Sequence, residues 1–200
     1  MKKIAIAALL SAVVAAPAFA ADNGFYIGAD LGRSSTSAAA GAVLTKSSDT
    51  VFGVLAGYQF TKNWGAEAFY TGAGKWTAQD TAGLANVNGK ADTWGVVGTG
   101  TLPLSDAFSL YGKLGYASTK TTVSCSVIIG GAACGNAGPS NATRGAATYG
   151  LGAIYNVTPA VGIRFGWDRY GAAVTNSVNG GGAKNNYNAN VYSLAATYKF

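Results

Sequence analysis

The sequence contains no histidine, and only 11% of its 200 residues are charged, whereas about a quarter are charged in a typical soluble domain. The absence of histidine excludes Ser-His-Asp and Cys-His catalysis as well as histidine metal ligands. The two cysteines are too few for a closed zinc site. We therefore expect no catalysis, no cofactor and no bound metal.

Glycine is abundant, with 29 residues, but it follows no Gly-X-Y repeat, which excludes a collagen helix. A hydrophobic fraction of 49% argues against disorder, and the chain has the length of one domain. The formal net charge of +6 falls to +4 if Lys2 and Lys3 are removed with the segment described next. This modest charge gives no indication of a nucleic-acid partner.

The first twenty residues have the pattern of a secretory signal peptide. Lys2 and Lys3 precede an apolar stretch, residues 4–16, that is too short to span a bilayer as a helix. Ala18-Phe19-Ala20 matches an A-x-A cleavage site, so we predict residues 1–20 as the signal peptide and 21–200 as the mature domain. The alternative is an N-terminal membrane anchor, but nothing extends the apolar stretch.

Secretion would place the mature chain in an oxidising compartment, where cysteines form disulfides. Eight residues, half of them glycine or alanine, separate Cys125 from Cys134 and allow the chain to close tightly. We predict a disulfide within one surface loop, contributing about 2–3 kcal/mol by the chain-entropy estimate. The alternative is two free thiols.

Large apolar residues alternate with small or polar ones through most of the mature chain, which is typical of β-strands with one apolar face. In VGIRFGWD (161–168), for example, every second residue from Val161 to Trp167 is large and apolar. Eight such segments are predicted as strands, at about 24–34, 50–60, 64–76, 91–102, 107–120, 144–156, 161–172 and 188–200. Short turns fall at 61–63, 103–106 and 157–160, and long polar loops at about 35–49, 77–90, 121–143 and 173–187.

This pattern predicts an all-β fold, an eight-stranded antiparallel transmembrane β-barrel of a bacterial outer membrane. A closed antiparallel sheet pairs every backbone polar group within lipid, which an open sheet does not. The alternative is a soluble β-sandwich or lipocalin-like barrel with its large residues turned inward.

Aromatic residues fall near both ends of the predicted strands, as expected for two membrane interfaces. A soluble barrel would bury these aromatic rows. The row at the short-turn end comprises Phe25, Tyr58, Phe60, Trp64, Phe108, Tyr155, Tyr198 and Phe200, and the other row comprises Trp76, Trp94, Tyr116, Tyr149 and Trp167.

Several runs resemble the eight-stranded transmembrane domain of the outer membrane protein A family. They are GFYIGADLG (24–32), GYQF followed by WGAEAFY (57–70), LPLSDAFSLYGKLGY (102–116), IYNVTPAVGIRFGW (154–167) and the ending SLAATYKF. The resemblance covers nearly all of the mature chain except its loops, and it implies the same barrel. Many family members carry a periplasmic peptidoglycan-binding domain; the sequence ends at Phe200, so we expect neither that domain nor a tether to the cell wall.

The alternation that turns apolar residues toward lipid turns a second set of residues inward, and this set contains three acids and three bases. Unpaired charges inside a narrow barrel would each cost on the order of several kcal/mol, so this balance predicts an interior ion-pair network. We expect Lys113 and Arg164 to be the partners of Asp30 and Glu67. The network comprises Asp30, Glu67, Lys113, Arg164, Asp168 and Lys199.

The resemblance implies a role for part of this network. Glu67 and Arg164 match an interior pair implicated in gating in the family, and Lys113 matches a further interior base. Thr99 and Ile154 stand where the family has another lysine and glutamate, so its four-charge arrangement is incomplete here. The charges either fill and stiffen the barrel or control ion passage.

Eight strands leave an interior just wide enough for side chains, so a broad pore is not expected. Inward glycines, Gly57 and Gly166 among them, either leave room for water or make space for Tyr26, Tyr111 and Phe69.

We therefore predict a structural and surface-interaction role in the outer membrane, with four loops presented outside. One alternative is a low-conductance ion or small-solute channel gated by Glu67 and Arg164, and another is a binder of hydrophobic small molecules in the barrel mouth. The expected partners are outer-membrane lipid and lipopolysaccharide. During assembly, periplasmic chaperones and the barrel-assembly machinery would engage the C-terminal Phe200. We expect a monomer.

A folded barrel should migrate differently on a detergent gel before and after boiling, because its closed sheet resists detergent until it is heated. Identical mobility of the two samples, or a mature chain that is monomeric and compact in plain buffer without micelles, would contradict the predicted fold.

Overall fold

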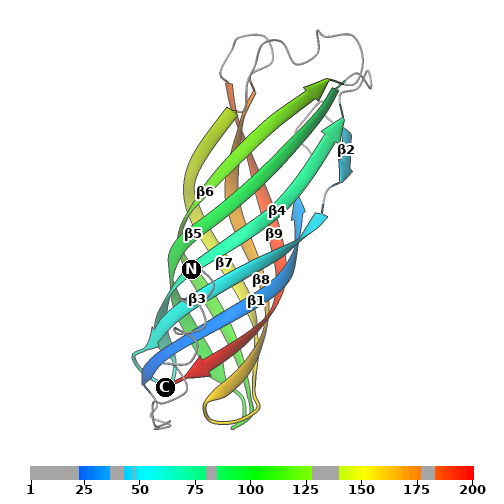
Figure 1. Ribbon diagram of the computed structural model, residues 1–200. Coiled ribbons are helices and arrows are strands. Elements are labelled where there is room, and N and C mark those ends of the chain that lie inside the picture. The colour runs from blue at the N-terminus through cyan, green and yellow to red at the C-terminus, as the bar shows by residue number, and fades with distance from the viewer. Residues whose placement is uncertain (1–22, 37–42, 47, 80–84, 128–139, 177–182) are drawn as a thin grey trace, which may run out of the picture.

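The computed structural model describes residues 23–36, 43–46, 48–79, 85–127, 140–176 and 183–200, and these residues form an all-β protein (Figure 1). The strands are β1 (Gly24–Thr36), β2 (Val43–Lys46), β3 (Ser48–Gln59), β4 (Trp64–Gln79), β5 (Ala85–Pro103), β6 (Phe108–Val127), β7 (Ser140–Asn156), β8 (Val161–Asn176) and β9 (Ala183–Lys199). Among these residues, no helix is long and apolar enough to cross a membrane.

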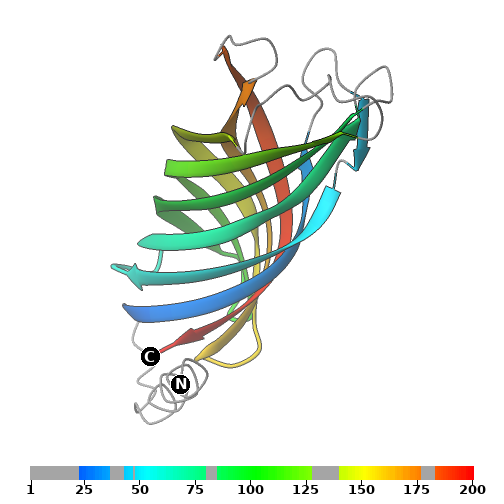
Figure 2. The ribbon, with the colours of Figure 1, turned by 45° about the horizontal axis from the view of Figure 1, so that its top comes forward.

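Eight long strands close into a barrel. All paired neighbours are antiparallel, and the order β4-β3-β1-β9-β8-β7-β6-β5 closes because β5 also pairs with β4. The short β2 pairs only with the outer part of β4. Figures 1 and 2 show the strands wrapping obliquely around one axis. The predicted eight-stranded antiparallel barrel is confirmed.

Three short turns connect the strands at one end of the barrel, called here the turn end. All three have the same hydrogen-bonding pattern. In each, an apolar residue is followed by Ser or Thr, whose hydroxyl oxygen accepts a hydrogen bond from the backbone N–H three residues later. These bonds join Trp64 N to Thr61 Oγ1 (3.1 Å), Phe108 N to Ser105 Oγ (3.0 Å) and Val161 N to Thr158 Oγ1 (3.0 Å). The predicted short turns are confirmed to within one residue.

The strands extend further toward the opposite end, called the loop end, than the sequence pattern predicts. The composition predicts a loop over 121–143, yet β6 continues to Val127 and β7 begins at Ser140. Thr119 and Thr121 explain the extension, because their β-branched side chains alternate inward and are buried. The other three predicted loops are shortened in the same way.

Cys125 lies in β6, but its proposed partner Cys134 lies outside the described residues. Residues 1–20 lie outside them as well. The disulfide and the signal peptide therefore stay predictions.

Successive residues point alternately into the barrel and out of it. On β5, Val96 is 60% exposed while Val97 is 4% exposed, and on β6 Leu114 is 67% exposed while Tyr111 is 7% exposed. Large apolar side chains therefore cover the outside. The soluble barrel with inward-facing apolar residues is excluded.

The outward apolar residues form a continuous band around the barrel. The band runs from Phe25 to Leu31 on β1 and from Phe200 to Tyr192 on β9, and the next outward residues, Arg33 and Asn190, are polar. The nine residues from Tyr192 to Phe200 match the length of about 9–11 residues with which a tilted strand crosses a bilayer, and the seven residues from Phe25 to Leu31 approach it.

Aromatic residues border the band at both ends. Phe25 and Tyr58 pack edge to face at the turn end, with ring centroids 4.7 Å apart, and Tyr149 and Trp167 do so at 5.9 Å near the loop end. The side chain of Trp76 lies outside the described part of the structure, so its place in this row stays a prediction. The row at the loop end also includes Tyr70 and Tyr192.

The hydrogen-bonded ladder between β7 and β8 ends before either strand ends. β7 and β8 pair from Asn156 and Gly162 up to Tyr149 and Arg169, and both strands then continue toward the loop end without pairing to each other. The Thr148 hydroxyl donates a hydrogen bond to the carbonyl oxygen of Arg169 at this point (2.9 Å). We call this boundary the β7–β8 seam.

Replacing Leu151 with arginine should destabilise the barrel, because Leu151 is 60% exposed in the middle of the apolar band. The expected loss is about 2–4 kcal/mol in urea unfolding from lipid vesicles. Leu104 provides a matched control, since it is 57% exposed but lies in a turn. Leu104→Arg should cost about 0–1 kcal/mol. Equal losses for the two variants would show that the band does not face lipid.

Candidate functional site

The central feature of the barrel interior is an ion pair that crosses it. Glu67 projects inward from β4 and Arg164 from β8, and these strands occupy opposite sides of the eight-stranded ring. Arg164 Nη2 lies 2.7 Å from Glu67 Oε1, and both residues are buried. The charge-assisted hydrogen bond therefore ties two opposite walls together.

Two tyrosines flank this pair. The guanidinium carbon of Arg164 lies 4.4 Å from the centroid of the Tyr111 ring and 6.0 Å from that of Tyr26. The rings fit because glycines face them: a Cβ atom at Gly57 would overlap Tyr26, and one at Gly166 would lie 2.5 Å from the Tyr111 hydroxyl oxygen. The inward glycines thus make space for side chains.

A second ion pair lies beside the first. Lys113 Nζ of β6 lies 2.9 Å from Asp168 Oδ1 of β8, and the Lys113 ammonium also lies 5.9 Å from the centroid of the Phe69 ring. The expected pairing of Lys113 with Asp30 is wrong, since among the described residues Asp30 forms no ion pair. β8 stands two strands from β6, whereas β1, which carries Asp30, stands directly across the lumen.

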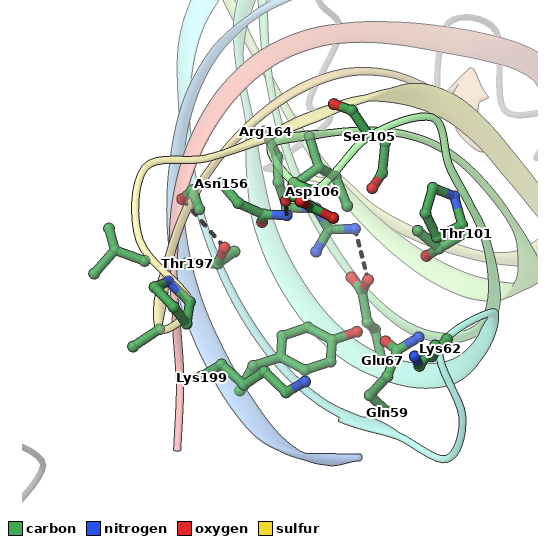
Figure 3. A pocket seen from close by; sticks show the side chains of 18 residues that line it. Gln59, Lys62, Glu67, Thr101, Ser105, Asp106, Asn156, Arg164, Thr197 and Lys199 are labelled. Carbon is green, nitrogen blue, oxygen red and sulfur yellow. Dashed lines mark hydrogen bonds and ion pairs between the residues drawn. The ribbon is translucent and has the colours of Figure 1, made fainter. Parts of the chain in front are cut away.

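A vestibule of about 370 Å³ leads from the turn end to the Glu67–Arg164 pair. Figure 3 shows Glu67 and Arg164 joined by their hydrogen bond, with Lys62, Asp106 and Lys199 around them. Lys199 is therefore separate from the two ion pairs, although the sequence places it in the same network.

Directly beyond the central pair, the described residues leave little space. The next cavity measures about 20 Å³, room for about one water molecule, and five of the six predicted network residues line it. These five are Asp30, Glu67, Lys113, Arg164 and Asp168.

Nearer the loop end, the interior is packed with buried residues that sequence reasoning missed. Thr93 and Thr119 hydrogen-bond through their hydroxyls (3.0 Å), and Tyr170 packs in a buried cluster with Val51 and Val191. The spacing of Thr119 and Thr121 in β6 is the signal that could have revealed this layer. We call it the threonine layer, and it comprises Thr71, Thr93, Thr119, Thr121 and Thr148.

Comparison with solved structures supports the fold. Neisserial surface protein A is 17% identical with a TM-score of 0.58 over 88% of this chain and 97% of that one. The outer membrane protein OprG from Pseudomonas aeruginosa is 16% identical with a TM-score of 0.57, over 88% of this chain and 96% of that one. Ail, the attachment invasion locus protein of Yersinia pestis, crystallised with the heparin analogue sucrose octasulfate, is 18% identical with a TM-score of 0.50, over 89% and 97% of the two chains.

At sequence identities this low, similarity to these structures shows a shared fold and nothing about function. No curated protein matches the sequence. The sequence does match the family described as outer membrane protein beta-barrel domain over residues 6–200, nearly its whole length. The chain therefore belongs to the outer membrane protein beta-barrel family, and its place is the outer membrane of bacteria.

Proposed function

We propose that the protein is a structural barrel whose lumen is closed to ions and whose loop end takes part in surface interactions. The observation that carries the proposal is the Glu67–Arg164 bridge across the lumen at 2.7 Å, with Tyr111 stacked on the guanidinium. An ion entering from the vestibule meets this bridge first.

The interior beyond the bridge supports the same reading. A cavity of about 20 Å³ gives no room for a hydrated ion, and the threonine layer follows it. Opening a path would require several packed side chains to move together. A catalytic role forms no part of the proposal, because the sequence has no histidine and two of the three interior carboxylates, those of Glu67 and Asp168, are engaged in ion pairs.

One observation favours the channel alternative. The vestibule of about 370 Å³ ends directly on Glu67 and Arg164, so a rearrangement of this single pair would lengthen the open part of the lumen. In that case the pair would act as a gate, as the resemblance to the outer membrane protein A family implies. The two functions differ in what happens when the bridge is removed.

Arg164→Gln should destabilise the barrel by about 3–5 kcal/mol, because it leaves the buried Glu67 carboxylate without its partner. The double variant Glu67→Gln/Arg164→Gln should lose much less, since no unpaired charge remains. Lys199→Gln is the control, because it removes a cation from the vestibule without breaking either ion pair. The measurement is urea unfolding in vesicles, followed by tryptophan fluorescence. A loss for Arg164→Gln as small as that for Lys199→Gln would contradict a bridging role.

Conductance in planar bilayers separates the closed barrel from the channel. The native protein should give no sustained current, and Arg164→Ala should also give none, because the buried threonine layer and Tyr170 still lie inside the barrel toward the loop end. Lys199→Ala serves as the matched control, and a gel before boiling shows that each variant is folded. Sustained currents through the native protein that change in Arg164→Ala but not in Lys199→Ala would overturn the proposal in favour of the channel.

A further inference from the structure

Two arginines stand on the outside of the barrel where the apolar band ends at the loop end. Arg33 is the next outward residue after Leu31 on β1, and Arg169 is the next after Trp167 on β8. Their neighbours in the chain point inward, and several of these, such as Asp168, are buried. Both arginines therefore lie at the level where lipid acyl chains give way to headgroups.

β9 lies between β1 and β8 and unites the two arginines on one surface. Arg33 lies opposite Tyr192, which also lies opposite Trp167, and Arg169 lies opposite Asn190. Neighbouring strands are about 4.8 Å apart, so the two arginines are separated by roughly 10 Å across the strands and by two residues, about 7 Å, along them. We call this surface the arginine patch, comprising Arg33, Trp167, Arg169, Asn190 and Tyr192.

The patch has no acidic partner among the described residues. Arg33 donates one hydrogen bond, from Nε to the Ser48 hydroxyl oxygen (3.0 Å), and its two terminal nitrogens donate none to the other described residues. The Arg169 side chain makes no such contact in the described part of the chain. Two guanidinium groups therefore face the membrane boundary with most of their donors unused.

The opposite wall of the barrel is different. β5 stands across the ring from β9, and there Lys90 Nζ lies 3.2 Å from Asp92 Oδ2. Tyr70 also donates a hydrogen bond to Asp92 Oδ1 (3.1 Å). The charge of Lys90 on this wall is thus paired within the protein, whereas no such pair forms at the arginine patch among the described residues.

The chemistry around the arginines indicates the ligand that fits. Guanidinium groups bind phosphate through paired hydrogen bonds. Tyr192 is 60% exposed, and it and Trp167 offer flat aromatic faces beside the arginines. Below them, Leu31, Phe165 and Leu194 belong to the apolar band, where acyl chains lie. A molecule that matches all three levels carries phosphate, a ring-bearing headgroup and acyl chains.

We propose that the arginine patch is a binding site for a phosphorylated glycolipid of the outer leaflet. Arg33 and Arg169 bind its phosphate groups, Trp167 and Tyr192 pack against its sugar rings, and its acyl chains lie along the band. This inference is independent of whether the lumen conducts, because every residue involved faces outward.

The test uses the full protein in phosphatidylcholine vesicles that contain increasing amounts of fluorescently labelled diphosphoryl lipid A. Energy transfer from the protein's tryptophans to the label reports binding. The variant Arg33→Gln/Arg169→Gln should weaken the apparent affinity about tenfold or more, since charge-assisted hydrogen bonds are lost. Lipid A from which both phosphates have been removed should bind the native protein and this variant equally weakly.

Lys90→Gln/Lys120→Gln is the matched control, because it removes two exposed positive charges from the neighbouring strands β5 and β6, away from the arginine patch. It should change the affinity by less than about twofold, as expected where charge is already neutralised or remote. Gel mobility before boiling confirms that both double variants are folded. Unchanged binding by Arg33→Gln/Arg169→Gln, or an equal loss in both double variants, would overturn the proposal. If Arg33→Gln/Arg169→Gln weakened binding of the dephosphorylated lipid as much as binding of diphosphoryl lipid A, recognition of phosphate would be excluded.

Discussion

The structure depends on the requirement that every backbone N–H and C=O within lipid be paired inside the protein. The closed ladder from β1 round to β9 meets this requirement, because each long strand pairs along the band on both sides. The alternation of side chains follows from the ladder. Apolar residues such as Leu114 and Val96 then cover the outside, and the polar residues at the level of the apolar band must fit within a narrow lumen.

That confinement determines the interior. A ring of eight strands leaves little space, so charged groups placed there reach each other across the lumen or along its wall. Glu67 and Arg164 meet from opposite strands, and Lys113 and Asp168 meet from strands two apart. Glycines opposite Tyr26 and Tyr111 allow the rings to pack around the guanidinium. The interior thus contains charged residues of the kind found in functional sites, but around the ion pairs these side chains are packed closely, as in a protein core.

Local periodicity predicts the strands, their faces and their inward charges, because a side chain's direction in a strand depends only on its position in the chain. It does not predict which inward charges meet, since Lys113, Asp30 and Asp168 lie on strands that are not neighbours, and the distances between them follow from closure of the whole ring. Composition also does not predict where the strands end. Threonines such as Thr121 suit a polar loop and a buried strand equally well.

The β7–β8 seam makes the outer part of the barrel wall separable from the part that crosses the membrane. Beyond Tyr149 and Arg169, the hairpin of β8 and β9 is hydrogen-bonded to itself and not to β7. Lengthening, shortening or exchanging this hairpin would therefore leave the membrane-embedded ladder intact. The fold can therefore accept changes in length and sequence at the loop end while the same ladder holds the hairpin in place.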